Sequence, residues 1–287
     1  MLRRTITVFV LIPPVIYLIG WSPRWLFLLA LVATVELGLR EFFHISRQAG
    51  FKSFPALGYV AGAAVAVVPA LQLERFEDLT LALLVLLLMV ISSVALRKSI
   101  EFKDYLGAIA TTLFGIVYVG VFLSCLVPLR FSQPAMGERW FGVVARGDIV
   151  IGRNLLLLLF LVVWAGDMFA YLIGRPFGRT PFFTRISPRK TVEGAVAGLA
   201  GSLLVAWGFR QLFWKTADLK TVMLLAGLMA LAGQIGDLVE SAMKRGANLK
   251  DSGALLPGHG GMLDRIDSLL FAAPALWLAL TLRDLWP

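Results

Sequence analysis

The residues best suited to chemistry lie in one polar interval, residues 241–267, between two apolar runs. The interval combines cations that could bind phosphates with carboxylates that could bind a divalent metal. These side chains are Lys244, Arg245, Lys250, Asp251, Asp264, Arg265 and Asp267. At its centre, a turn with the sequence Gly-His-Gly-Gly at 258–261 would let the backbone approach a ligand closely. These residue types predict a phosphoryl- or nucleotidyl-transfer site.

A carboxylate stands at each end of this interval where an apolar run meets it. Asp237, Glu240 or Ser241, and Lys244 follow i, i+3/i+4, i+7 spacing, so they share one face of a helix. Asp264 lies near the end of the interval, in the first turn of the next expected helix. Because Mg²⁺ prefers one or two carboxylates completed by water and substrate phosphates, we predict Mg²⁺ at Asp237 and Asp264. The sequence leaves open whether a second cation binds.

Two segments upstream carry further polar groups. Asp167 lies inside an apolar run, where a charge needs a partner, a water-filled cavity or a metal; an ion pair with a neighbouring arginine is the structural alternative. Ser187 and Lys190 precede the next helical run, and a helix N-terminus with adjacent hydroxyls and cations suits a phosphate. A simple cluster of cytoplasmic charges is the alternative for this second segment.

Composition places these residues in a membrane protein. The chain of 287 residues is 59% hydrophobic and 16% charged, and its mean hydropathy is +0.82. A soluble domain would carry roughly a quarter charged residues. We therefore predict an all-α, polytopic protein with about nine transmembrane helices. Their expected ranges are 5–21, 25–39, 54–73, 79–96, 105–128, 154–173, 193–213, 220–240 and 266–286.

The loops indicate orientation. With nine spans, the N-terminus and the loops near 40–53, 97–104, 174–190 and 241–265 share one side, which holds most of the 27 Lys and Arg. We predict that the chain lies in the inner or plasma membrane. The positive-inside rule then places that side, with the N-terminus and the candidate active site, in the cytoplasm. The net charge of +9 is spread over these loops, which suits anionic lipid and argues against a nucleic-acid partner.

The motifs divide the chain by function. Residues 1–150 carry no catalytic motif and are expected to serve packing or dimerisation, whereas 151–287 would form the catalytic membrane domain. Within 164–267 the motifs resemble those of the phosphatidate cytidylyltransferase (CDP-diacylglycerol synthase) family. The matching positions are Asp167, Ala170, Tyr171, Gly174, Arg175, Ser187, Pro188, Lys190, Thr191, Glu193, Gly194, Ser241, Met243, Lys244, Arg245, Lys250, Asp251, Gly253, Leu256, Pro257, His259, Gly260, Gly261, Met262, Asp264, Arg265, Ile266 and Asp267.

The resemblance implies transfer of the cytidylyl group of CTP to phosphatidic acid, with Mg²⁺ held at the positions of Asp237 and Asp264. It also implies that the enzyme is a polytopic homodimer in the lipid bilayer. Catalytic roles would fall to Asp237, Lys244, Arg245, Lys250, Asp264 and Arg265. Substrate binding would fall to Asp167, Ser187, Lys190, Asp251, His259, Gly260, Gly261 and Asp267. Two other functions stay open from the residues: a CTP-dependent lipid kinase, and a carrier of phosphorylated lipids. The clustering of polar groups at one face argues against the carrier.

Overall fold

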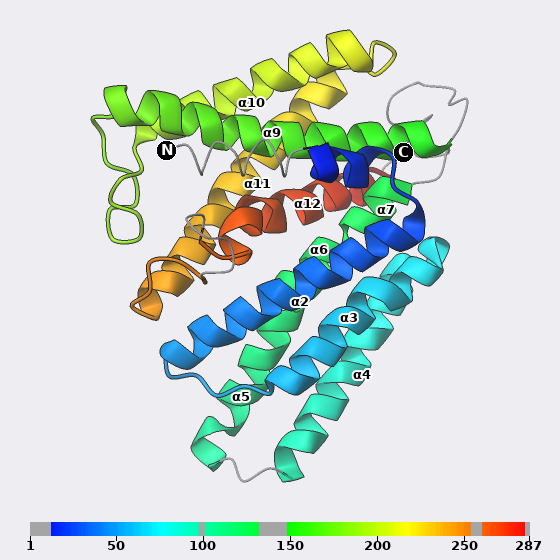
Figure 1. Cartoon of the computed structure of the whole chain (residues 1–287), viewed down its shortest axis with the longest axis vertical. Coiled ribbons are helices and arrows are strands. Elements are labelled where there is room, and N and C mark those ends of the chain that lie inside the picture. The colour runs from blue at the N-terminus through cyan, green and yellow to red at the C-terminus, as the bar shows by residue number, and fades with distance from the viewer. Residues whose placement is uncertain (1–12, 98–100, 132–147, 254–259, 285–287) are drawn as a thin grey trace. The chain divides into compact units, whose positions relative to one another are not determined.

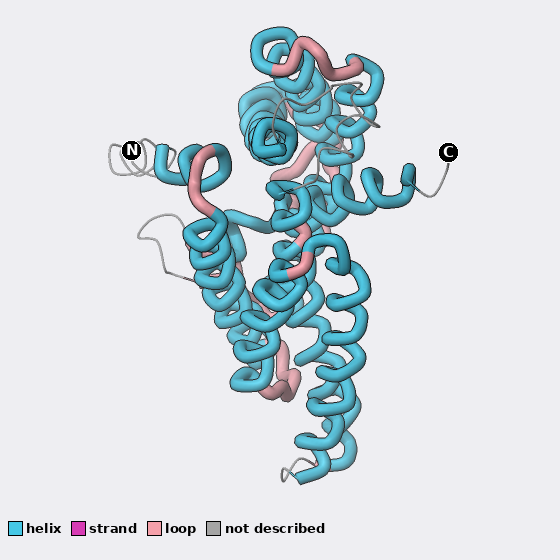
Figure 2. The backbone as a smooth tube through the Cα atoms, turned by 90° about the vertical axis from the view of Figure 1, so that its right-hand side faces the viewer, coloured by secondary structure: helices cyan, strands magenta, loops and turns pink. Residues whose placement is uncertain are grey.

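A computed structural model describes residues 13–97, 101–131, 148–253 and 260–284. These residues form helices joined by loops, with one isolated β-bridge between Pro181 and Thr191 and no strand within the described ranges (Figure 2). The prediction of an all-α protein is therefore confirmed. The chain divides into two compact units, residues 1–18, 22–127 and 243–266 forming the first and residues 19–21, 128–242 and 267–287 the second.

Six described helical segments are long and apolar enough to cross a membrane. They are Leu73–Leu96, Phe102–Phe131, Ile151–Phe177, Val192–Phe213, Leu219–Gly246 and Leu263–Leu282. The predicted total of about nine is not confirmed. The expected run at 54–73 forms a helix of only 17 residues, and charged residues interrupt the helix that contains the run at 25–39. The first eight residues of the run at 5–21 lie outside the described residues.

The first unit is a helical bundle drawn in blue to green in Figure 1. Its elements, in chain order, are α2 (Arg24–Gln48), α3 (Pro55–Leu71), the short 3₁₀ helix η1 (Leu73–Arg75), α4 (Phe76–Arg97), α5 (Phe102–Gly115), the π-helical η2 (Ile116–Val121) and α6 (Phe122–Ser124). Just beyond the end of α2, Gly50 has a φ of 86°, the left-handed conformation that glycine adopts without steric cost.

Glycines and aromatic rings bring the helices of this unit together. A Cβ atom on Gly58 of α3 would lie 2.3 Å from the ring of Phe43, and one on Gly62 would lie 2.3 Å from Leu39. Both neighbours belong to α2 and are almost fully buried. Close backbone approach at small residues is the usual way in which membrane helices associate. This packing fixes α2, and with it the side chain of Glu41.

The second unit is built mainly on a long helix pair, α9 (Asp148–Phe177) and α10 (Val192–Phe213) (Figure 1). The two helices pack closely because glycines of α10 face α9. A Cβ on Gly198 would lie 2.8 Å from the carbonyl oxygen of Gly166, and one on Gly201 would lie 2.3 Å from the ring of Phe169. Ser202 also donates a hydrogen bond across the pair, to the carbonyl of Val162 at 2.7 Å. The pair thereby holds the 178–191 loop at its end.

Two more helices contribute residues to both units: α11 (Leu219–Gly246) and α12 (Leu263–Asp284). Asp218 caps the start of α11, since its carboxylate accepts hydrogen bonds from the Thr221 amide and hydroxyl at 2.8 and 2.9 Å. At the other end, the amide of Leu249 bonds to the carbonyl of Lys244 at 2.8 Å, with Asn248 in the left-handed conformation. This Schellman-type ending turns the chain toward residue 252.

Candidate active site

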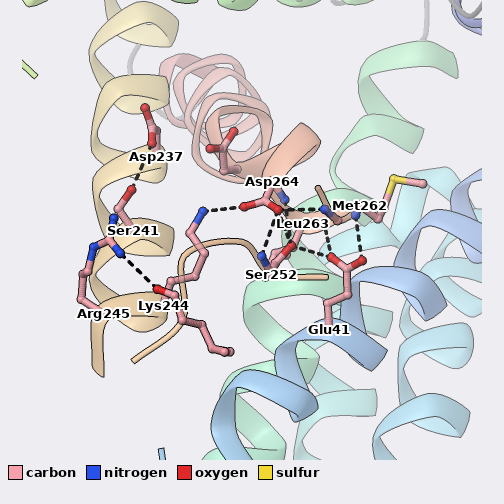
Figure 3. A network of polar contacts seen from close by, with 12 residues as sticks. Glu41, Asp237, Ser241, Lys244, Arg245, Ser252, Met262, Leu263 and Asp264 are labelled. Carbon is pink, nitrogen blue, oxygen red and sulfur yellow. Dashed lines mark hydrogen bonds and ion pairs between the residues drawn. The ribbon is translucent and has the colours of Figure 1, made fainter. Parts of the chain in front are cut away.

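The first group of predicted site residues surrounds Asp264, in the first turn of α12 (Figure 3). One carboxylate oxygen, Oδ1, accepts a hydrogen bond from Lys244 Nζ at 2.5 Å. The other, Oδ2, accepts bonds from the Ser252 amide at 2.9 Å and the Gly261 amide at 2.8 Å, and it shares the single hydroxyl proton of Ser252, whose Oγ lies 2.9 Å away, with Glu41. All of these residues belong to the first unit. We call Glu41, Lys244, Ser252, Gly261, Met262, Leu263 and Asp264 the Asp264 network.

The lysine in this network is largely shielded from water. The side chains of Lys244 and Asp264 are each 12% exposed, and each is the other's ion-pair partner. Because water screens such a pair weakly, the attraction is stronger than at an exposed site. The structure places Lys244, a predicted phosphate-binding cation, against Asp264, a predicted metal ligand.

The glycine-rich turn enters the network through its last two residues. Gly260 has a φ of 78°, so a larger residue would be strained there. A Cβ on Gly261 would lie 2.1 Å from the Ser252 hydroxyl and 2.2 Å from a carboxylate oxygen of Glu41. Both glycines therefore make room for neighbouring polar groups of the protein. His259, the histidine of this turn, lies outside the described residues.

Glu41 is the member of this network that lies farthest away in the sequence, and the sequence analysis does not identify it as a site residue. It lies on α2, more than 200 positions before the motif, and is 8% exposed. Its carboxylate accepts hydrogen bonds from the Ser252 hydroxyl and from the amides of Met262 and Leu263. In the sequence it appears only as one acid after Arg40 at the end of an apolar run, so no local pattern distinguishes it from an ordinary surface charge.

The other cations of the polar interval lie farther out. Arg245 is exposed, and its Nη1 donates to the carbonyl of Leu249 at 3.2 Å. Lys250, Asp251 and Arg265 are also exposed. Exposed cations beside a shielded pair could accept a charged ligand from solution.

The second group of predicted site residues lies in the second unit. Asp237 on α11 forms an ion pair with Lys190, and both side chains are 29% exposed. Its other oxygen accepts a long bond of 3.4 Å from the Ser241 hydroxyl (Figure 3). Asp267 lies within electrostatic range of Asp167, Asp237 and Glu240. We call Asp167, Lys190, Asp237, Glu240 and Asp267 the Asp237 cluster.

This cluster brings together residues that the sequence analysis takes from separate segments. Asp167 comes from α9, Lys190 from the loop before α10, Asp237 from α11 and Asp267 from α12. Asp167 interacts electrostatically with both Asp237 and Lys190. Glu240, which the sequence analysis places on the same helix face without giving it a role, is fully buried.

The 178–191 loop holds Lys190 in place. Its two ends are joined where the Phe182 amide bonds to the Lys190 carbonyl at 2.9 Å. Glu193, in the first turn of α10, accepts hydrogen bonds from the amides of Arg179 and Thr180 at 3.0–3.1 Å. Ser187 is half-buried, and its carbonyl accepts a bond from the Lys190 amide. The polar motif residues of this segment therefore shape the loop as well as supplying charge.

The carboxylates of the candidate site suit a hard divalent cation that takes only one or two ligands from the protein. Within the described ranges, no three His, Cys, Asp or Glu side chains are grouped closely enough to hold a metal ion. Mg²⁺ commonly takes only one or two carboxylates, with water and phosphates completing its shell. The carboxylates of the Asp237 cluster repel one another, and a bound cation would relieve that repulsion. Both oxygens of Asp264 already accept hydrogen bonds, so a metal there would replace Lys244.

Comparison with known proteins places these motifs in context. A family model described as "Cytidylyltransferase family" matches residues 2–283. A protein of Synechocystis sp. named phosphatidate cytidylyltransferase is 35% identical over 271 residues, covering 88% of this chain and 87% of the relative. One of Staphylococcus saprophyticus with the same name is 34% identical over 226 residues, covering 79% of each chain. The Arabidopsis thaliana protein named phosphatidate cytidylyltransferase 5, chloroplastic, is 34% identical over 262 residues, covering 86% of this chain but 64% of its own length.

Proposed function

Because the chain belongs to the cytidylyltransferase family, we propose that it is a membrane enzyme that transfers the cytidylyl group of CTP to phosphatidate. The products are CDP-diacylglycerol and pyrophosphate, and the reaction serves phospholipid synthesis. The structural observation that best supports this function is that each predicted metal ligand is paired with a lysine, Asp237 with Lys190 and Asp264 with Lys244. Such pairs place positive charge beside the carboxylates where polyphosphate must bind.

In the proposed reaction a phosphate oxygen of phosphatidate attacks the α-phosphorus of CTP. A new P–O bond forms to the lipid phosphate while the bond between the α-phosphorus and the bridging oxygen breaks, and pyrophosphate leaves with that electron pair. A phosphate monoester is already anionic at neutral pH, so the attacking oxygen needs no protein general base. Catalysis then depends on positioning the two phosphates and on neutralising their charge.

The lysines and arginines supply that neutralisation. We propose that Lys244, Arg245, Lys250 and Arg265 bind the triphosphate and the leaving pyrophosphate. Lys190 and Ser187 would bind the lipid phosphate, since they lie in a loop at the start of α10. Asp167, Asp251, His259, Gly260, Gly261 and Asp267 complete the proposed substrate-binding set.

Asp237 and Asp264 are the residues that would hold Mg²⁺, and the sequence leaves a second cation open. When bound, such an ion neutralises charge on the phosphate oxygens and orients them. With Mg²⁺ at Asp264, the ammonium group of Lys244 would be available to bind a phosphate oxygen of the substrate, since lysine has a long flexible side chain.

We further propose that the site faces the cytoplasm and that the enzyme is a homodimer. Orientation can be measured by single-cysteine labelling, because the native Cys125 is buried and should stay unlabelled. Thr184→Cys and Glu74→Cys each introduce a thiol at an exposed position, in loops predicted to lie on opposite sides. A membrane-impermeant maleimide should label position 74 in intact cells and position 184 only in inverted vesicles. The reverse pattern would refute the proposed orientation.

The acceptor tests the function. Purified protein should release pyrophosphate from CTP and Mg²⁺ only when phosphatidate is present, and cytidine should enter the lipid extract. Diacylglycerol is the matched acceptor control, because it is the same lipid without the attacking phosphate. Pyrophosphate release with phosphatidate and none with diacylglycerol supports cytidylyl transfer. Consumption of CTP with diacylglycerol and not with phosphatidate would favour the lipid-kinase alternative.

A further inference from the structure

The carboxylate of Glu41 accepts hydrogen bonds from two backbone amides at the start of α12 (Figure 3). Oε1 accepts a hydrogen bond from the Met262 amide at 2.9 Å, and Oε2 accepts one from the Leu263 amide at 2.8 Å. The first amides of a helix have no partner within the helix, and a side-chain oxygen of the preceding residue usually accepts from one of them. Met262, which precedes α12, has no such oxygen. Glu41 therefore performs from α2 the task of an N-cap residue.

The same carboxylate is connected to Asp264 through one hydroxyl group. Ser252 is 1% exposed, and its Oγ lies 2.7 Å from Oε2 of Glu41 and 2.9 Å from Oδ2 of Asp264. The Ser252 amide also donates to Asp264. Glu41 is thus connected to Asp264 in two ways. It binds the first turn of the helix on which Asp264 lies, and it binds Ser252, which contacts the Asp264 side chain.

Two glycines of the motif leave the space that Glu41 occupies. A Cβ on Gly253 would lie 2.6 Å from Oε1 of Glu41, and a Cβ on Gly261 would lie 2.2 Å from Oε2. Any side chain at either position would displace the carboxylate. This is independent of the hydrogen bonds, and it gives these glycines a role in accommodating a protein side chain as well as any ligand.

We propose that Glu41 is a positioning residue for the transfer reaction: it fixes Asp264 by holding Ser252 and the first turn of α12. The proposal rests on the function proposed above, because Asp264 is there a predicted metal ligand. Glu41 itself lies behind Asp264 and binds backbone and hydroxyl donors. It also gives the N-terminal half, which carries no catalytic motif, a part in the reaction.

The test compares Glu41→Gln with Glu36→Gln. Glu36 lies on the same helix and makes no hydrogen bond to residues 252, 253 or 260–264, so it is a matched control. Gln at position 41 keeps one acceptor oxygen but turns an NH₂ group toward a donor. Since a misplacement of about 1 Å can cost about 100-fold in rate, we expect kcat to fall at least ~10-fold. The KM for CTP should change less than about threefold, because Glu41 is not placed to bind it.

A second measurement does not need activity. Hydrogen exchange of a peptide covering 260–266 should accelerate about 10-fold or more in Glu41→Gln, because the Met262 and Leu263 amides lose an acceptor. Peptides from α10 should exchange as in wild type, and Glu36→Gln should match wild type throughout. If wild type makes no CDP-lipid but exchange changes as described, the proposed function fails while the role of Glu41 in holding α12 stands.

Two results would overturn the proposal. One is a Glu41→Gln protein with kcat within twofold of wild type and unchanged exchange at 260–266. The other is accelerated exchange in α10 to the same degree as at 260–266, since Glu41 would then support the whole fold and not the position of Asp264.

Discussion

The pair between Lys244 and Asp264 can be tested by removing each partner and then both. Lys244→Met deletes the ammonium group but keeps most of the apolar chain. Asp264→Asn keeps an oxygen that can accept from Ser252 and Gly261, but places an amide where Lys244 donates. The double variant has neither charge. Comparing the four proteins separates the stabilising role of the pair from its role in the reaction.

The size of the effect follows from burial. Removing one partner of a buried pair costs about 3–5 kcal/mol. Both side chains are 12% exposed, and three further hydrogen bonds still reach Asp264, so we expect the lower end, about 3 kcal/mol. At about 2–4 °C per kcal/mol for a chain of this size, each single variant should lower the apparent Tm by about 6–12 °C. The double variant should recover part of this loss, because no unpaired charge remains buried.

Thermal unfolding in detergent and the cytidylyl-transfer assay supply the two readouts. Lys103→Met is the matched control, since Lys103 and Glu101 form a pair of similar length, 2.6 Å, with side chains 73% and 67% exposed. An exposed pair contributes about 0–1 kcal/mol, so this variant should shift Tm by less than about 4 °C. The double variant should stay inactive although its Tm recovers. Recovery of activity together with Tm would refute a direct role for these side chains, and single variants that unfold like the control would refute the buried pair.

Two further predictions concern the surroundings of the site. Gly261→Ala should lower both Tm and activity, because its Cβ would lie within 2.2 Å of two oxygen atoms. Gly107→Ala is the control: its Cβ would meet no neighbouring atom within 4 Å, so activity should stay as in wild type and Tm should stay unchanged or rise slightly. Equal behaviour of the two variants would contradict this prediction. Glu193→Ala should speed tryptic cleavage in the 178–190 loop, since the backbone amides at its start lose their acceptor. Asp218→Ala removes a comparable carboxylate cap elsewhere and should leave that cleavage rate unchanged; equal rates for both variants would show that Glu193 does not hold the loop.

The sequence predicts well those features that depend on local composition. Long apolar runs lead to helices, so the segments at 79–96, 105–128, 154–173, 193–213 and 220–240 all fall within described helices. The count of spans is less predictable, because crossing a bilayer depends on both length and charge. The helix α2 continues nine residues past the predicted end at 39, since Arg40 and Glu41 are compatible with a helix although not with an uninterrupted apolar span.

The site illustrates the same division. Asp237, Lys244, Asp264 and Asp267 could be proposed as site residues because of their spacing along a helix and the motif. The contacts between residues could not be predicted, because they join distant segments: Lys190, itself a predicted site residue, pairs with Asp237 across 47 positions, and Glu41 reaches Ser252 across 211. Side-chain packing in three dimensions determines such contacts, and no periodic pattern in the sequence records them.

The most direct test of the account uses CTP labelled twice, with ³H in the cytosine and ³²P at the γ-phosphate, incubated with the purified protein, phosphatidate, diacylglycerol and Mg²⁺. Cytidylyl transfer predicts ³H in the lipid phase and ³²P in the aqueous phase as pyrophosphate. With Asp264→Ala, neither ³H-labelled lipid nor ³²P-labelled pyrophosphate should form. The opposite distribution, with ³²P in the lipid and ³H in aqueous CDP, would contradict the account and identify a phosphoryl transferase.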